Sequence, residues 1–286
     1  MSSGGDVFAQ LVGQASAVAT LRAAAGGQGM THSWLFVGPP GSGRSVAARC
    51  FAAALQCTST PVGCGECAGC HTVMTGSHPD VQFVVPDGLS IPVAQMRSLV
   101  MRSATAPTSG RWQVLVVEDA DRLTEAAGNA LLKAVEEPPV RTVFLLCAPS
   151  DHPDDVPLTI RSRCRVVTLR QPAPEDVAAL LVSRDGVSPD LAEWVADAAL
   201  GHVGRARWLA SSAEARSRRS AVLAIPRQLT GVGACFEAAS SLIAAAEAES
   251  EAATASVDAS ERAAMETALG AGGTGKGAAG AARGMA

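Results

Sequence analysis

The sequence predicts an α/β fold with a parallel β-sheet covered by helices on both faces, followed by a smaller helical domain. Three observations predict it. Short continuous apolar runs alternate with longer segments of helical periodicity. A Gly/Pro-rich loop separates the first apolar run from a helix, and beyond residue 170 the apolar runs give way to amphipathic helical patterns. Continuous apolar strands that alternate with helices are typical of parallel sheets buried on both faces.

The elements follow in order along the chain. Strands are expected at residues 34–37, 114–117, 143–147 and 165–169. The first strand is followed by the Gly/Pro loop and then by a helix whose apolar residues continue at helical spacing to Leu55. A helical pattern between the second and third strands, at 125–137, ends where Pro138 and Pro139 prevent continuation.

Length and composition fit this class. The chain has 286 residues, 48% of them hydrophobic, and a formal net charge of -4, which is enough for about two domains with ordinary cores. That charge gives no global cationic field for sequence-blind nucleic-acid binding, so any DNA contact has to come from a local patch or from partners. The N-terminus lacks a signal peptide, and no apolar run approaches the roughly 20 residues that span a bilayer. We therefore expect a cytoplasmic protein without a membrane segment.

The predicted elements divide the chain into three parts. Residues 1–170 form the sheet domain, 171–230 form the small helical domain, and 231–286 begin a further helical domain. In the last part a helix is expected over 234–246, and the glycine-rich final ~20 residues are expected to be disordered. No closing element follows, which favours a fragment of a longer chain.

The loop after the first strand fits a phosphate-binding loop. The candidate nucleotide-binding residues are Gly38, Gly41, Gly43, Arg44 and Ser45. Glycines let backbone N–H groups converge on phosphates, and the helix N-terminus adds partial positive charge. The Ser45 hydroxyl is placed to ligate Mg²⁺. We predict a nucleotide phosphate site, with an ordinary Gly/Pro turn as the alternative.

Two departures from the usual pattern predict that this site is degenerate. Arg44 stands where the pattern has lysine, and a planar guanidinium does not replace a compact ammonium between phosphates. After the second strand, Glu118 and Asp119 are the candidate acids, but Asp119 reaches about one methylene less far than a glutamate base would. Both changes affect the chemistry more than the binding. We therefore predict no intrinsic ATPase activity and leave open whether ATP and Mg²⁺ are bound.

Four of the eight cysteines cluster within fourteen residues: Cys57, Cys64, Cys67 and Cys70. In a reducing cytoplasm this spacing indicates a metal site, with disulfides or chance enrichment as alternatives. Four thiolates can converge on Zn²⁺ at ~2.3 Å, and because they leave no open coordination position the metal would be structural. We expect the insertion at 57–70 to lie outside the core, so that metal removal unfolds it and leaves the sheet intact.

Two arginines are candidates for contacts with nucleotide. Arg163 precedes the last strand, near the carboxyl edge of the sheet, where an arginine can stabilise charge on a phosphate bound by a neighbouring subunit. A solvated arginine or a structural salt bridge is the alternative. In the small helical domain, Arg205 is a candidate to face the nucleotide, and a helix-surface arginine is equally consistent with the sequence.

Together these motifs resemble bacterial clamp-loader subunits of DNA polymerase III, and among them the delta-prime type. The resemblance covers about residues 7–210 and is carried by the phosphate loop, the four cysteines, VEDAD at 117–121, NALLKAVEEPP at 129–139 and SRC at 162–164. It implies an AAA+ core with a zinc insertion, a helical lid and the beginning of a collar domain. It also implies that Arg163 is an arginine finger acting in trans on an adjacent motor subunit.

The resemblance further implies a function. Motor subunits of the family, gamma/tau, have lysine in the loop and Asp-Glu in the second motif, whereas the delta-prime loop is often degenerate, as Arg44 and Glu118-Asp119 are here. A delta-prime-like stator would join gamma/tau and delta subunits and help ATP-dependent loading of the sliding clamp onto primed DNA, as part of the DNA polymerase holoenzyme. The alternatives are an ATP-hydrolysing motor subunit or other AAA+ ATPase, and a zinc-dependent nucleic-acid-binding module.

Overall fold

The computed structural model describes residues 5–86 and 88–269. The chain divides into two compact units, Met1–Ser212 and Ala213–Ala286. The glycine-rich stretch from residue 270 onward, which carries most of the predicted disorder, lies outside the described residues.

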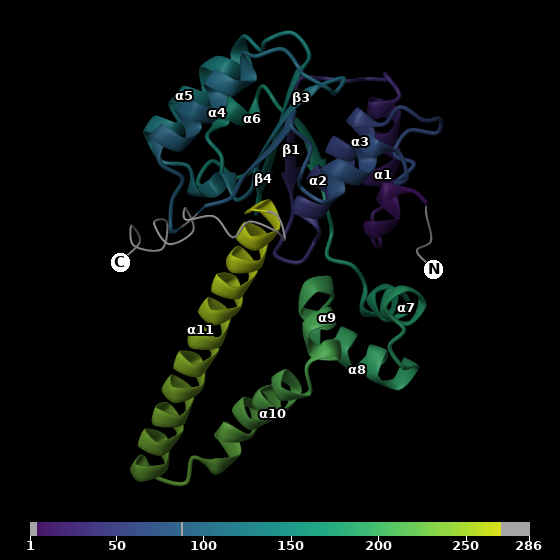
Figure 1. The fold of residues 1–286 in the computed structure, drawn as a ribbon. Helices are drawn as coiled ribbons and strands as arrows, with labels where there is room; N and C mark the ends of the chain where they lie inside the picture. The colour runs from purple at the N-terminus through teal and green to yellow at the C-terminus, as the bar shows by residue number, and fades with distance from the viewer. Residues whose placement is uncertain (1–4, 87, 270–286) are drawn as a thin grey trace. The chain divides into compact units, whose positions relative to one another are not determined.

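A five-stranded parallel sheet forms the centre of the first unit (Figure 1). Its strands are β1 (Ser33–Val37), β2 (Val81–Val84), β3 (Gln113–Val117), β4 (Thr142–Ala148) and β5 (Arg165–Thr168). Their order is β2-β3-β4-β1-β5, and every neighbouring pair is parallel. The α/β fold with a parallel sheet is therefore confirmed, and the edge strand β2 is an addition to the four predicted strands.

Each face of the sheet is covered by its own helices (Figure 1). On one face lie α1 (Ala15–Ala25), α2 (Arg44–Gln56) and α3 (Ala68–Met74), with the short 3-10 helix η1 (Val7–Gln10). On the other lie α4 (Val93–Ser103), α5 (Glu125–Glu136) and α6 (Leu158–Arg161), with η2 (Ala120–Arg122). Successive strand residues alternate between these two cores: Trp34 packs in the first and Leu35 in the second. This two-sided burial explains why the central strands are continuously apolar.

Three helices complete the first unit and form its lid. They are α7 (Pro174–Asp185), α8 (Pro189–Ala199) and α9 (Val203–Ser211). Proline occupies the first position of α7 and of α8, where its fixed φ favours helix initiation. Gly186 ends α7 in the left-handed conformation at φ 67°.

The second unit contains helices α10 (Ala213–Gln228) and α11 (Val232–Leu269). The predicted lid range, 171–230, includes the residues of α10, whereas the compact first unit ends at Ser212. Helix α11 continues past the predicted end at residue 246 because the following segment is rich in Ala and Glu, which favour helix. Among the described residues, no helix is long and apolar enough to cross a membrane.

Candidate functional site

The phosphate loop lies between β1 and α2, as predicted. Gly41 and Gly43 have φ angles of 88° and 90°, a conformation that glycine adopts without strain. The loop borders a cavity of about 360 Å³ whose other walls are residues 10–12 and parts of the lid. The backbone shape and the helix N-terminus of a phosphate site are therefore present.

The acids after β3 lie at the same edge of the sheet. Strand β4 separates β1 from β3, so the loop after β1 and the residues after β3 flank the end of one strand. Glu118 directly follows β3, and its backbone N–H donates to the carbonyl of Val84 at 2.9 Å. Asp119 has a φ of 51°, a left-handed conformation that is uncommon outside glycine.

The Arg44 side chain is turned toward these acids. Its Nη2 lies 3.8 Å from Oδ1 of Asp119, and only 14% of the side chain is exposed. Nη1 of Arg44 and Oδ1 of Asp121 are buried without a hydrogen-bond partner. Burial, reinforced by the Asp119 carboxylate, raises the pKa of Asp121. Arg44 is therefore the counter-ion of an acidic cluster in its own chain.

The lid contributes residues that the sequence analysis missed. Arg184, His202 and Arg207 line the cavity at the phosphate loop, whereas Arg205 is not among the lining residues. A Cβ atom at Gly41 would come within 2.7 Å of Cγ of His202, so the imidazole packs directly on the loop. These positions depend on how the lid folds back on the core, and helical periodicity carries no signal for that. The contact of Arg205 with nucleotide stays a prediction.

The four cysteines converge as a metal site requires. Sγ of Cys57 lies 3.7 Å from Sγ of Cys64 and 3.9 Å from Sγ of Cys67, and all four sulfurs lie within 4.8 Å of one another. Tetrahedral Zn–S bonds of ~2.3 Å correspond to sulfur separations of ~3.8 Å. This cluster can therefore bind a metal ion, and its soft sulfur donors fit zinc.

Hydrogen bonds around the cluster favour thiolates. The backbone N–H groups of Cys67 and Cys70 each donate at 3.4 Å to the sulfur three residues earlier. A hydrogen bond from Ser59, with those of nearby backbone groups, lowers the pKa of Cys64 to about 6. Burial raises the pKa of Cys70. A metal would have to displace that proton to recruit the fourth ligand.

The expectation that this insertion lies outside the core is wrong. Cys57 and Cys70 are fully buried and belong to the same hydrophobic core as β1 and α2. The insertion is also hydrogen-bonded to η1, because the Gly63 carbonyl accepts from the N–H of Val7 at 2.8 Å. Since α2 ends at Cys57, the cluster continues the packing of the phosphate-loop helix.

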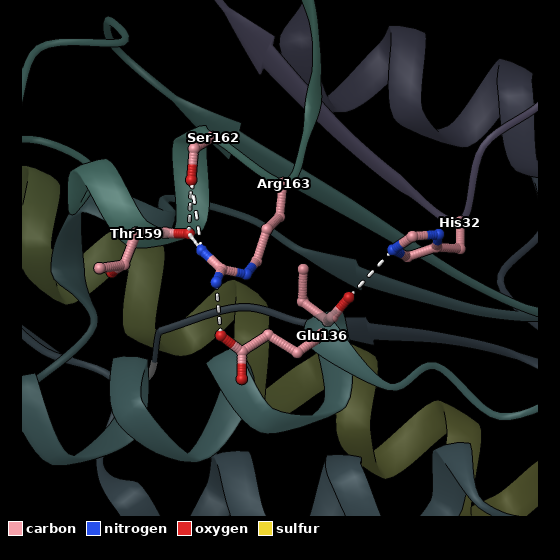
Figure 2. A network of polar contacts seen from close by, with 6 residues as sticks. His32, Glu136, Thr159, Ser162 and Arg163 are labelled. Carbon is pink, nitrogen blue, oxygen red and sulfur yellow. Dashed lines mark hydrogen bonds and ion pairs between the residues drawn. The ribbon is translucent and has the colours of Figure 1, made fainter.

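Arg163 lies between the end of α6 and the end of α5 (Figure 2). Its Nη2 lies 2.7 Å from Oε1 of Glu136, and Nη1 donates to the Thr159 carbonyl at 2.8 Å and to Oγ of Ser162 at 3.3 Å. The Arg163 side chain is 39% exposed. The predicted finger is therefore held within its own chain at an accessible position. The expectation that it lies near the carboxyl edge is wrong, because Arg163 directly precedes β5 of a parallel sheet and so lies at the amino edge.

The two neighbouring arginines have other partners. Nη2 of Arg161 lies 2.6 Å from Oδ2 of Asp151. Arg165 donates to the carbonyl of Gly29 at 2.6 Å and lies over the Trp34 ring at 5.0 Å.

The parallel sheet with this strand order, the phosphate loop after β1, the acids after β3 and the helical lid define a P-loop module of the AAA+ type. Comparison with known sequences identifies the family within that class. The chain belongs to the DNA polymerase III delta subunit family, because a family model described as "DNA polymerase III, delta subunit" matches residues 13–173.

Individual relatives agree with this assignment. The chain is 36% identical over 160 residues to DNA polymerase III subunit tau of Bacillus subtilis, covering 55% of this chain and 28% of the relative. It is 32% identical over 169 residues to subunit delta' of the same organism, covering 59% of this chain and 50% of the relative. It is 35% identical over 159 residues to subunit delta' of Escherichia coli, covering 54% of this chain and 46% of the relative. The chain thus spans half or less of the length of these curated relatives.

Proposed function

We propose that this chain is a delta-prime-like stator subunit of a DNA polymerase III clamp loader, without ATPase activity of its own. The observation that carries the proposal is the contact between Arg44 and Asp119. A working site needs a cation that reaches the nucleotide phosphates and an acid free to hold Mg²⁺ or position water. Here the cation and the acid engage each other, with Nη2 and Oδ1 3.8 Å apart.

The order of the acids supports the same conclusion. Glu118 directly follows β3 and Asp119 comes next. Because a general base has to lie within hydrogen-bond reach of its proton, the shorter Asp119, already beside Arg44, is a poor base. Nucleotide bound at the loop would be held by backbone N–H groups and Ser45, without efficient hydrolysis.

In the proposed subunit Arg163 acts in trans. Its side chain is 39% exposed, so a neighbouring subunit can reach it. Arginine suits phosphate because its planar fork donates two parallel hydrogen bonds and stays charged at all physiological pH values. The proposed role is to stabilise the charge that develops on a γ-phosphate held by the neighbour.

The proposed partners follow from the family. We place the chain with gamma/tau motor subunits and a delta subunit, in a complex that loads a sliding clamp onto primed DNA. The relatives named tau and delta' support membership of that assembly. The proposed ion at Cys57, Cys64, Cys67 and Cys70 is Zn²⁺, which would cross-link the insertion and supply no catalysis.

A motor subunit is the second candidate. The preformed loop glycines and the adjoining cavity of about 360 Å³ favour it, and 36% identity to a tau subunit is compatible with it. Turnover by the isolated chain separates the two candidates.

The experiment is single-turnover ATP hydrolysis by the isolated chain, as wild type and as Arg44→Ala. We expect neither protein to hydrolyse ATP above the buffer rate. Hydrolysis that Arg44→Ala abolishes would overturn the stator proposal and assign the chain to the motors. Hydrolysis that stays equal in both proteins after repurification would also overturn the stator proposal, because the chain would then turn over ATP without Arg44.

A further inference from the structure

Glu136 is the carboxylate that contacts Arg163. The two residues are far apart in sequence, because Glu136 ends α5 and Arg163 follows α6. The other two acceptors, the Thr159 carbonyl and Ser162 Oγ, are neutral and belong to the same turn as Arg163. Among the contacts described for this guanidinium, Glu136 is therefore the one that comes from a separate element and carries charge.

The end of α5 is fixed to the strand that precedes the phosphate loop. The Val135 carbonyl lies 2.9 Å from Nε2 of His32, the residue directly before β1 (Figure 2). The last carbonyls of a helix lack partners within the helix, so this hydrogen bond anchors the turn that carries Glu136. Val135 itself is fully buried in the core under α5. The carboxylate thus projects from a rigid base.

We propose that Glu136 is a positioning residue that holds Arg163 in a resting position and releases it to the phosphate of a neighbouring subunit. This inference rests on the proposed trans role of Arg163. Glu136 and the phosphate compete for one guanidinium, so engagement in trans requires the pair to break. The contact keeps the side chain ordered while the neighbouring site is empty.

The ion pair between Arg163 and Glu136 is expected to be weak enough for a phosphate to displace the carboxylate. Both partners are about two-fifths exposed, Arg163 at 39% and Glu136 at 40%. Exposed ion pairs of this kind shift an equilibrium by no more than about fivefold, whereas charge-assisted, bidentate contacts to phosphate are stronger. When only a fraction of the protein is in the state that can bind a ligand, the apparent affinity falls by that fraction. Here the competent state is the one in which Arg163 is not paired with Glu136. Removal of the Glu136 carboxylate should therefore strengthen the coupling to the neighbour's nucleotide.

The test is an ATP titration of the hydrolysis rate in the reconstituted clamp-loader complex. The variants of this chain are Glu136→Gln, Glu137→Gln, Arg163→Ala and the double variant Glu136→Gln/Arg163→Ala. Glu137 is the matched control, since it is the next residue, is exposed and forms no ion pair among the described residues. Thermal melting of each variant chain verifies that it folds.

We expect Glu136→Gln to lower the ATP concentration at half-maximal rate about two- to fivefold with the maximal rate unchanged, and Glu137→Gln to match wild type. The double variant should behave like Arg163→Ala. The gain from Glu136→Gln should shrink at high salt, because salt screens the pair in the wild type. A purely structural role for Glu136 would lower the maximal rate and would not require Arg163.

Two failures are distinguishable. If Arg163→Ala slows hydrolysis but Glu136→Gln matches wild type or loses rate, Glu136 is not a positioning residue and the stator proposal survives. If Arg163→Ala leaves hydrolysis unchanged, the trans finger is wrong and the role of Glu136 is overturned with it.

Discussion

Two arginines at opposite edges of one parallel sheet have different surroundings. Arg44, at the start of α2, is 14% exposed and faces Asp119 at 3.8 Å. Arg163, after α6, is 39% exposed and contacts Glu136 at 2.7 Å. Both guanidiniums have a carboxylate partner that is 40% exposed, so the two pairs differ in the burial of the arginine alone. An arginine near water leaves its partner at little cost, whereas a poorly solvated one is left with an unpaired charge.

Burial, more than pairing, therefore distinguishes the arginine that a partner could reach, Arg163, from the one that faces its own chain, Arg44. The Arg44 guanidinium faces an acid of its own chain. The contact of Arg163 leaves its side chain accessible, and a stronger anion can replace Glu136.

Metal removal should affect the Arg44 region and spare the Arg163 region. Because α2 runs from the phosphate loop to Cys57, chelation or Cys67→Ser should loosen α3 and the end of α2. We expect stability to fall by more than about 3 kcal/mol, because loss of a bound metal is one of the few mechanisms that produce losses beyond the usual range. Hydrogen exchange should quicken at 57–74 and 6–11. Equal loss of protection at 158–168 would show that the two arginine regions do not respond separately to metal removal. The control is Cys235→Ser, which replaces an exposed cysteine outside the cluster.

Asp80→Asn should lower stability without altering either arginine. The buried Asp80 carboxylate accepts from the backbone N–H groups of Thr108 and Ser109 at 2.7 and 2.8 Å. We expect a loss of about 2–3 kcal/mol, because an amide nitrogen would face donors in a buried place. Urea unfolding at pH 7 measures it, with Asp190→Asn, an exposed carboxyl in the first turn of α8, as the control.

The same carboxylate predicts an acid dependence. Burial alone would raise the pKa of Asp80, but the hydroxyl and backbone donors of residues 108–110 outweigh it and hold the pKa well below its usual range. Its stabilisation is therefore complete above the unfolded pKa of about 3.9 and is lost as the pH falls toward the folded value. The stability gap between wild type and Asp80→Asn should narrow below about pH 4. A gap that stays constant down to pH 2 would contradict this assignment.

Arg44→Lys tests whether the Arg44 guanidinium weakens nucleotide binding at the phosphate loop. A compact ammonium can reach the phosphates, and Asp119 loses its close guanidinium. We expect ATP with Mg²⁺ to bind about tenfold tighter, about 1.4 kcal/mol, still without hydrolysis because Asp119 remains short. Calorimetric titration measures the change, and Arg49→Lys, on the same helix but stacked on Phe83, is the control. Appearance of turnover would show that the acids are competent after all.

Much of the fold could be predicted because its signals are local. Strands β1, β3 and β4 are buried on both faces and therefore appear as continuous apolar runs. Strand β2 was missed because it has four residues, of which the middle two are half-buried. The cysteine cluster was found from its spacing, but the spacing carries no information on depth, and the expectation that it lies outside the core was wrong.

The contacts that define the candidate site could not be predicted from the sequence. The contact between Arg44 and Asp119 depends on a left-handed backbone at Asp119, which no motif requires. Glu136 and Arg163 are 27 positions apart in sequence and meet because the ends of α5 and α6 lie beside each other. Residue identity marked these side chains as candidates, and tertiary packing decides which carboxylate each arginine contacts.

The most direct test of the central claim is single-turnover ATP hydrolysis by the reconstituted complex containing wild-type, Arg163→Ala or Arg161→Ala chain. Arg161 is the matched control, because it lies two residues away and pairs with Asp151 in its own chain. Arg163→Ala should slow hydrolysis at the neighbouring site by about a thousandfold, as expected for loss of an arginine finger, and Arg161→Ala should stay near the wild-type rate. A wild-type rate with Arg163→Ala would contradict the account.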